Sequence, residues 1–298
     1  MEKILLLTGD NIAYQQRLGT CQFTDDPDSA AIWLAEPARA AALLRQGHRP
    51  DWLASTFAGV DALIAPDLPR DYTLTNVRGI FGPLMAQYVF AHLLSRLREL
   101  PRYAKQQADA QWQPHPYGSL EGQTLVLLGT GDIGRHIAMA ASAFGMKVTG
   151  VSRSGNPAPG YDEVHPVSAL DKVLPRADVL VSVLPNTPQS HHLLNTETLA
   201  WLPEHAVLIN VGRGHTLCLE ALLTQLDQNR LAHAILDVFE QEPLSADSPL
   251  WGHPKVTITP HVAATSFPDQ IAAQFLDNLA RYRRDEPLIN QVEFTRGY

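Results

Sequence analysis

Three residues with complementary chemistry each follow a short apolar run in the C-terminal half of the chain. Arg213 lies in INVGRGHTL, Glu242 in DVFEQEPL and His261 in TITPHVAAT. An arginine can pair bidentately with a carboxylate, and a histidine can give or take a proton near neutral pH. A nearby carboxylate favours the protonated imidazole. Together these side chains would suit the reduction of a 2-oxo acid by hydride transfer.

Each of these residues also has a purely structural interpretation. Arg213 could hold a turn, His261 could be a structural histidine after Pro260, and Glu242 could be one exposed acid among 31 aspartates and glutamates. Taken singly, neither interpretation is preferred. All three residues, however, follow predicted strands, and ligands of open α/β sheets bind outside the carboxyl ends of the strands. We therefore favour a shared functional role.

Alternating strands and helices must position these side chains. In the second half of the chain, near-continuous apolar runs predict strands at 124–129, 147–152, 178–185, 206–210, 233–239 and 256–260. Helical stretches separate most of them, which indicates a parallel sheet covered on both faces. In the first hundred residues KILLLT, AAIWLA and DWLAST predict further strands, and ARAAALLRQG predicts a helix with a glycine cap.

The chain is therefore an α/β protein with two doubly wound parallel-sheet domains. We assign residues 1–88 and 268–298 to a smaller, flavodoxin-like substrate domain, and residues 89–267 to a Rossmann-type nucleotide domain. A long helical pattern from Leu84 to Ala110, kinked at Pro101, joins them. The last helix, PDQIAAQFLDNLARYRRDE, is expected to pack back on the first domain.

A glycine-rich turn follows the first strand of the second domain. Gly129, Gly131 and Gly134 have G-x-G-x-x-G spacing, after an apolar strand and at the start of an amphipathic helix. Such a loop lets a pyrophosphate approach the backbone, and the helix N-terminus supplies N–H groups to the phosphates. We predict a dinucleotide site that also includes Asp132 and Ile133. A plain strand-to-helix turn is the less favoured interpretation.

The next strand ends without the acid that usually selects NAD. In NAD-selective sites a carboxylate near this point accepts hydrogen bonds from the ribose 2′-OH, and it would repel a phosphate. Here the chain has Ser152, Arg153 and Ser154, which offer one cation and two hydroxyl groups. This set suits a 2′-phosphate, so we predict a preference for NADP(H), with NAD(H) possible. The alternative is that Arg153 is a solvated loop residue.

Composition excludes several other classes of protein. The formal net charge of -8 argues against a nucleic-acid partner, because the composition provides no excess of basic residues to neutralise phosphates. No apolar run approaches the length of a membrane span, and MEKILLLTGD is expected to be a first strand rather than a signal peptide. Cys21 and Cys218 lack ligand spacing, which fits a reducing compartment. We therefore expect a cytoplasmic protein with no membrane partner.

Two further features are assigned no catalytic role. His191 and His192 are adjacent, but no acid or cysteine lies at ligand spacing near them, so we expect a solvated pair and no metal site. Trp33 and Trp52 could line a substrate site, but residues of this kind are more often core or interface anchors.

Several stretches together resemble the NAD(P)-dependent D-2-hydroxyacid dehydrogenases over nearly the whole chain. They are LLGTGDIGRHIA, LPNTPQSHHLLN, LINVGRGHTLCLEALLTQL, AILDVFEQEPLSADSPLW and VTITPHVAATS. The resemblance implies that Arg213, Glu242 and His261 are catalytic and that Asp237 binds the carboxamide of the cofactor. It also implies that Pro185 and Val211 contact the cofactor, and that Arg213 shares the substrate carboxylate with backbone amides of Ala58, Gly59 and Val60.

Within the family, the chain is most similar to the glyoxylate/hydroxypyruvate reductase A type. The features that carry this similarity are the Ser-Arg pair after the second strand, VTITPHVAA and the terminal RGY. The similarity implies NADPH-dependent reduction of small anionic 2-oxo acids, with protonated His261 as proton donor, and a homodimer. This cofactor agrees with the interpretation of Arg153 from its charge.

Two alternatives remain open at this point. One is an NAD-linked dehydrogenase of another D-2-hydroxy acid. The other is a nucleotide-sensing interaction protein that keeps the fold without catalysis, against which stand the compact length and the intact arginine, glutamate and histidine. Short-chain dehydrogenase chemistry is excluded, because no Tyr-x-x-x-Lys occurs in the chain.

Overall fold

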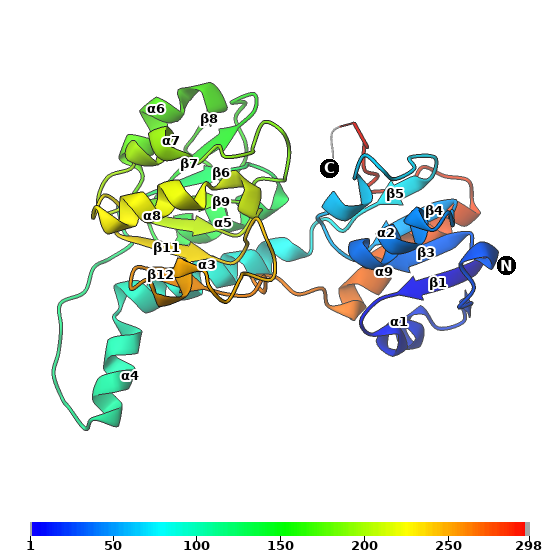
Figure 1. Ribbon diagram of the computed structural model, residues 1–298, viewed down its shortest axis with the longest axis horizontal. Coiled ribbons are helices and arrows are strands. Elements are labelled where there is room, and N and C mark those ends of the chain that lie inside the picture. The colour runs from blue at the N-terminus through cyan, green and yellow to red at the C-terminus, as the bar shows by residue number, and fades with distance from the viewer. Residues whose placement is uncertain (1, 296–298) are drawn as a thin grey trace. The chain divides into compact units, whose positions relative to one another are not determined.

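The computed structural model describes residues 2–295 and contains two compact units (Figure 1). One consists of the chain up to Phe81 together with the part from Thr265 onward, and the other is Gly82–Ala264. The sequence-based boundaries, 88/89 and 267/268, lie a few residues further along the chain than these divisions. The terminal RGY lies outside the described residues.

The first unit is built on a five-stranded sheet in which every strand pair is parallel. Its strands are β1 (Lys3–Leu7), β2 (Gln22–Phe23), β3 (Ile32–Ala35), β4 (Trp52–Ser55) and β5 (Thr73–Thr75), in the order β2-β1-β3-β4-β5. This is the flavodoxin-like order. Its α-helices are α1 (Asn11–Leu18), α2 (Pro37–Arg45) and α9 (Pro268–Arg283). Trp33 and Trp52 are fully buried, which confirms that they belong to the core.

The second unit contains a seven-stranded sheet, also parallel throughout. Its strands are β6 (Thr124–Leu128), β7 (Lys147–Ser152), β8 (Glu163–Pro166), β9 (Val179–Ser182), β10 (Val207–Asn210), β11 (His233–Leu236) and β12 (Val256–Ile258). The order β12-β11-β10-β9-β6-β7-β8 reverses direction between β6 and β9. Such a reversal is the Rossmann arrangement, and ligands bind beside it. The predicted fold class is confirmed.

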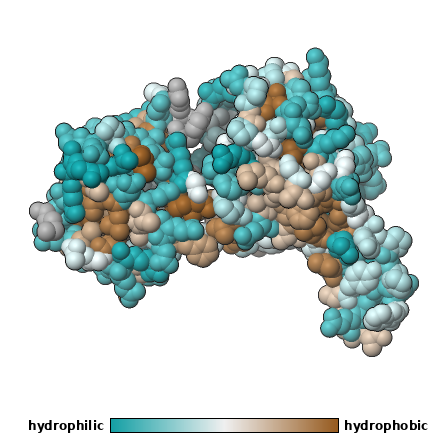
Figure 2. Space-filling view, turned by 180° about the vertical axis from the view of Figure 1, so that it is seen from behind, coloured by the Kyte–Doolittle hydropathy of each residue, from teal (hydrophilic) through white to brown (hydrophobic). Residues whose placement is uncertain are grey.

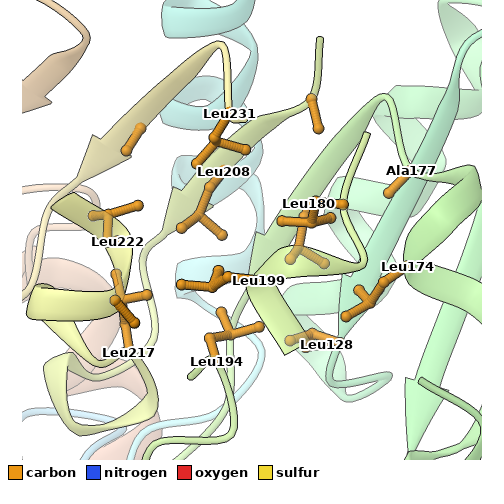
Figure 3. Close-up of a cluster of buried hydrophobic side chains, with 14 of the residues drawn as sticks. Leu128, Leu174, Ala177, Leu180, Leu194, Leu199, Leu208, Leu217, Leu222 and Leu231 are labelled. Atoms are coloured by element: carbon orange, nitrogen blue, oxygen red, sulfur yellow. The ribbon is translucent and has the colours of Figure 1, made fainter. Parts of the chain in front are cut away.

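Helices cover both faces of this larger sheet (Figure 1). The α-helices of this unit are α3 (Phe81–Leu97), α4 (Leu100–Ala108), α5 (Asp132–Ala143), α6 (Leu170–Val173), α7 (Thr196–Ala200) and α8 (Leu219–Asp227). Along β6, Val126 and Leu128 enter one buried cluster, while Leu125 and Leu127 enter the other. Figure 3 shows the first cluster, in which leucines from strands and helices interdigitate. Burial of one such side chain contributes about 1.5–3 kcal/mol to the free energy of unfolding. The loops that follow the strands therefore begin from a well-packed core.

The long helix predicted over 84–110 is two helices. α3 ends at Leu97, α4 begins at Leu100, and Glu99 between them has a left-handed backbone with φ 56°. Pro101 causes the break, because proline cannot donate a backbone hydrogen bond and its ring crowds the preceding turn. Proline is tolerated in the first turn of the new helix, where it lies here.

A segment that contains α4 projects from the second unit in Figure 1. Figure 2, which shows the opposite face, places apolar residues on this unit beside the base of the projection. Trp112, which follows α4, is completely exposed, and Tyr117 is 62% exposed. No helix among residues 2–295 combines the length and the apolar character that a membrane span requires.

Candidate active site

The three candidate catalytic residues follow three neighbouring strands of the larger sheet. β10, β11 and β12 pair in parallel, so their carboxyl ends lie at one edge of the sheet. Arg213 follows β10, Glu242 follows β11, and His261 follows β12. The convergence therefore comes from strand order rather than from proximity in sequence.

His261 and Glu242 form the central contact of this edge. Nδ1 of His261 lies 2.8 Å from Oε2 of Glu242, and both side chains are partly exposed, at 52% and 36%. The other carboxylate oxygen, Oε1, accepts a hydrogen bond from the backbone N–H of Phe239 at 2.9 Å. Glu242 is thus held by the backbone and in turn orients the imidazole. Among residues 2–295, Nε2 of His261 has no hydrogen-bond partner, so this nitrogen can serve a substrate.

Asp237 anchors the segment that carries His261. This carboxylate is almost fully buried and accepts three hydrogen bonds. The backbone N–H of Val262 donates to Oδ1 at 2.8 Å, and that of Ala263 donates to Oδ2 at 2.9 Å. The Thr259 hydroxyl also donates to Oδ1, at 2.6 Å. Burial of a charged group is tolerated when it is hydrogen-bonded in this way.

The backbone at His261 has a conformation that few side chains adopt. Its φ is 55°, a left-handed value that costs about 1–2 kcal/mol for a residue with a Cβ atom. The backbone N–H of His261 donates to the carbonyl oxygen of Asp237 at 2.9 Å. The Asp237 carboxylate also binds Thr259 before His261 and Val262 after it. Asp237 therefore fixes the backbone around His261 through both its carbonyl oxygen and its side chain.

A partly buried tyrosine extends this network. The Tyr88 hydroxyl lies 2.5 Å from Oγ1 of Thr259. Because the Thr259 proton is directed to Asp237, Tyr88 is the donor in this pair. Burial raises the pKa of Tyr88 to about 12, which keeps the donor protonated throughout the physiological range.

Arg213 lies in a turn that packs tightly against the segment before Glu242. Its carbonyl oxygen accepts from Nδ2 of Asn210 at 3.0 Å and from Oγ1 of Thr216 at 2.8 Å. At the next residue, Gly214, a Cβ atom would lie 1.9 Å from the carbonyl carbon of Phe239. The second glycine of GRG is therefore required for this close approach. The guanidinium is half-buried, and its Nη1 donates to the carbonyl of Gly212 at 2.8 Å.

The glycine loop joins β6 to α5 in a geometry that fits a dinucleotide. Gly129 has φ 107°, and a Cβ atom on Gly134 would lie 2.2 Å from the carbonyl oxygen of Gly129. Strand and helix therefore meet closely only because both residues are glycine. Gly131 is the N-cap and supplies no capping side chain. The first N–H groups of α5, from Asp132 and Ile133, thus donate no hydrogen bond to a capping side chain. Such groups can bind a phosphate.

The Ser-Arg-Ser sequence lies where β7 ends. Ser152 is the last strand residue, and Arg153 and Ser154 are exposed. The hydroxyl oxygens of Ser152 and Ser154 accept from the N–H groups of Gly155 and Asn156, which holds the loop in one conformation. The nearest following acid, Asp162, accepts instead from the N–H of Val148, at the opposite end of β7.

The remaining predicted residues lie in three loops. Pro185 follows β9, and its carbonyl oxygen accepts from the Ser190 hydroxyl at 2.6 Å. Val211 follows β10 and is buried. In the first unit, Ala58, Gly59 and Val60 follow β4, and the Val60 side chain is buried. Among residues 2–295, none of the last three N–H groups donates a hydrogen bond.

Sequence reasoning missed three residues of this region. Tyr88 and Thr259 were not singled out, although they complete the network of Asp237. Glu240 was also missed, and it is the acid that lies beside the histidine pair at 191–192. An acid near these histidines was not expected, since the partner comes from a segment almost fifty residues away.

Comparison with known proteins identifies the family. The family model described as "D-isomer specific 2-hydroxyacid dehydrogenase, NAD binding domain" matches residues 90–263. The Escherichia fergusonii protein called glyoxylate/hydroxypyruvate reductase A is 31% identical over 283 residues, which cover 93% of this chain and 90% of that protein. The chain belongs to the D-isomer specific 2-hydroxyacid dehydrogenase family, and it is an NAD(P)-dependent enzyme.

Solved structures agree with this assignment. A D-isomer specific 2-hydroxyacid dehydrogenase family protein from Aeromonas salmonicida subsp. salmonicida is 48% identical, with a TM-score of 0.94 and coverage of 98% of this chain and 99% of that one. An NADPH-dependent glyoxylate/hydroxypyruvate reductase from Sinorhizobium meliloti, in complex with NADP and sulfate, is 28% identical. Its TM-score is 0.89, and both chains are fully covered.

Proposed function

We propose that this enzyme uses NADPH to reduce small 2-oxo acids, glyoxylate and hydroxypyruvate among them, to 2-hydroxy acids. The observation that carries the proposal is the 2.8 Å contact between His261 and Glu242. It lies at the carboxyl edge of the same sheet that bears the glycine loop. The names and ligands of the relatives from E. fergusonii and S. meliloti support this choice of substrate and cofactor.

The proposed roles follow from the contacts of each side chain. His261, as an imidazolium, donates a proton to the oxygen of the substrate's 2-carbonyl group, and Glu242 orients the ring. Arg213 binds the substrate carboxylate and polarises the carbonyl group. A bound nicotinamide cofactor supplies the hydride. Asp237 already accepts three hydrogen bonds, and a carboxylate accepts about four, so one position remains for the cofactor's carboxamide.

We further propose that backbone amides of Ala58, Gly59 and Val60 help to bind the substrate carboxylate. Their N–H groups are without partners in the described part of the chain, as noted above. Successive N–H groups of a loop form concave sites for anions. We also propose that residues 1–88 and 268–298 form the substrate domain and that residues 89–267 form the nucleotide domain.

The direct test is a panel of 2-oxo acids assayed with NADPH and with NADH. We expect oxidation of NADPH with glyoxylate and hydroxypyruvate, and a lower kcat/KM with NADH. Substantial turnover with NADH alone would identify an NAD-linked dehydrogenase instead. Cofactor binding without turnover of any 2-oxo acid would favour a nucleotide sensor and would overturn the proposal.

Arg213→Lys should impair the handling of the substrate carboxylate. Lysine keeps the charge but cannot present a planar fork to a carboxylate. We expect kcat/KM for glyoxylate to fall roughly a hundredfold, which corresponds to about 2.7 kcal/mol, while the Kd for NADPH stays unchanged. Steady-state kinetics and fluorescence titration measure the two quantities. Arg230→Lys, an exposed change before β11, is the control, and equal effects of both changes would refute the assignment.

Arg153→Ala should weaken NADPH much more than NADH. The guanidinium is proposed to pair with the 2′-phosphate, a charge-assisted contact worth about 1.5–3 kcal/mol. We therefore expect the Kd for NADPH to rise at least roughly tenfold and that for NADH to change little. Lys147→Ala, at the other end of β7, is the matched control. Equal weakening of both cofactors would contradict the phosphate contact.

We also propose a homodimer that works in the cytoplasm. The projecting segment at 100–117 supports the first part, because Trp112 is completely exposed and Tyr117 is 62% exposed, and large exposed apolar side chains on one segment are typical of an interface. Cys21 and Cys218 are both free thiols, which supports a reducing compartment.

A further inference from the structure

Two histidines and an acid converge on the surface of the second unit, outside the proposed catalytic residues. His191 and His192 lie in the turn between β9 and α7, and Glu240 follows β11. Nε2 of His191 is 3.8 Å from Oε1 of Glu240, and Nε2 of His192 is 3.6 Å from Oε2. One donor atom from each residue lies within 4.8 Å of the other two.

These separations are too long for hydrogen bonds. Two other histidine–carboxylate pairs of the same unit do lie at hydrogen-bond distance, at 2.8 Å for His261 with Glu242 and 2.7 Å for His205 with Asp178. Nε2 of His192 is in addition shielded from solvent and has no hydrogen-bond partner. A buried polar atom without a hydrogen-bond partner destabilises the folded state. The two imidazole nitrogens and the carboxylate therefore lie close together without forming hydrogen bonds to one another.

The backbone holds these three residues in place. The N–H of His192 donates to the carbonyl of His215 at 2.8 Å, and His192 has φ 46°, so its position in the turn is tightly specified. On the other side, a Cβ atom on Gly214 would lie 2.2 Å from the backbone nitrogen of Glu240. The turn at 214 thus packs directly against the acid. The histidine turn and Glu240 therefore both contact the segment that follows β10, at His215 and Gly214.

We propose that His191, His192 and Glu240 bind a divalent transition-metal ion, with two imidazole nitrogens and one carboxylate oxygen as ligands. Zn²⁺ binds such atoms at about 2.0–2.2 Å, which places neighbouring ligands about 3.3 Å apart. The present separations approach this value. The two imidazoles are stacked, with ring centroids 4.0 Å apart. Small rotations of the side chains would bring the three ligand atoms to metal-binding distance.

The donor set determines which ions fit. Imidazole nitrogens suit Zn²⁺, Ni²⁺ and Cu²⁺, whereas Mg²⁺ prefers oxygen ligands. All three side chains are partly exposed, so water fills the remaining coordination position, as in open three-ligand sites. A bound ion would tie the turn after β9 to the segment after β11.

The test is calorimetric titration of the full, tag-free, chelator-treated chain with Zn²⁺, and separately with Mg²⁺. We expect one equivalent of Zn²⁺ to bind at pH 7.5, a higher Tm with Zn²⁺, and no heat with Mg²⁺. Affinity should fall as the solution is made more acidic, because protons compete with the metal ion for the imidazole nitrogens.

Three variants assign the ligands. His192→Asn keeps a residue that tolerates positive φ, and Glu240→Gln keeps the side-chain shape; each should weaken Zn²⁺ binding at least about tenfold. His205→Ala, which removes a histidine at another carboxylate, should bind Zn²⁺ as the unaltered chain does, and so should His261→Ala. Circular dichroism confirms that each variant is folded. The proposal is overturned if the unaltered chain binds no Zn²⁺, or if both ligand variants retain full affinity.

Discussion

Replacing His261 with alanine should reduce kcat for glyoxylate by about 10²–10⁴-fold, the usual contribution of a positioned general acid. The Kd for NADPH should remain within about twofold of its original value, because the glycine loop and the Ser-Arg-Ser loop are untouched. The imidazole is partly exposed and its Nδ1 contacts only Glu242 among the described residues, so the fold should survive. Stopped-flow measurement of NADPH oxidation and a fluorescence titration give the two quantities.

A matched control is available in the same unit. His205 also pairs with a carboxylate, since its Nε2 lies 2.7 Å from Oδ1 of Asp178. It precedes β10 and therefore lies at the amino edge of the sheet, opposite the candidate site. His205→Ala should leave kcat unchanged. A His261→Ala enzyme with the turnover of this control would exclude His261 as proton donor.

Asp237→Asn should reduce both the stability of the enzyme and its turnover. Asparagine keeps the shape but replaces one carboxylate oxygen with an NH₂ group, which would face at least one of the donors from Thr259, Val262 and Ala263. A buried donor without an acceptor costs about 1–3 kcal/mol. For a unit of this size, the Tm should fall roughly 2–10 °C. Thermal unfolding followed by circular dichroism measures this shift.

The effect on turnover distinguishes positioning from stability alone. Asp237 holds the left-handed backbone at His261, so its loss should let the imidazole leave its orientation and lower kcat at least roughly tenfold at a temperature where the variant is folded. Asp162→Asn removes a carboxylate that accepts from the N–H of Val148 at the opposite edge of the sheet. This control should lose some stability but keep kcat. Unchanged kcat in Asp237→Asn would show that the carboxylate does not position His261.

The sequence predicted the central strands well because burial on both faces leaves a strong apolar signal. The strands at 124–128, 147–152 and 207–210 were all expected within a residue or two. β2, β5 and β8 were missed. They contain two to four residues, and β8 is only half-buried along its whole length, so periodicity has little to detect. Such edge strands form because they pair by hydrogen bonds with the neighbouring strand, and not because their own residues have a strong strand propensity.

The candidate site was predictable to the extent that strand order brings residues together. Arg213, Glu242 and His261 were selected because each follows a strand, and the parallel pairing of those strands places them at one edge. Tyr88 could not be found in this way. It lies on an apolar helix 171 residues from Thr259, and no spacing rule connects the two.

The acid beside the histidine pair illustrates the same limit. Glu240 reaches His191 and His192 because Gly214 lets two backbones approach closely. Local sequence around the histidines contains no sign of this packing. A glycine read as a turn residue can therefore determine which distant side chains become neighbours.

Arg213, Asp237, Glu242, His261 and the glycine loop all belong to the unit Gly82–Ala264. The proposed catalytic residues and the proposed dinucleotide loop thus lie in one uninterrupted stretch of chain, while the other unit is assembled from an N-terminal and a C-terminal segment. If Ala58, Gly59 and Val60 bind the substrate carboxylate as proposed, substitutions in the smaller unit would change substrate binding and leave the proposed catalytic residues unaltered. Chimaeras that exchange only the terminal segments between relatives are a natural route to new specificities.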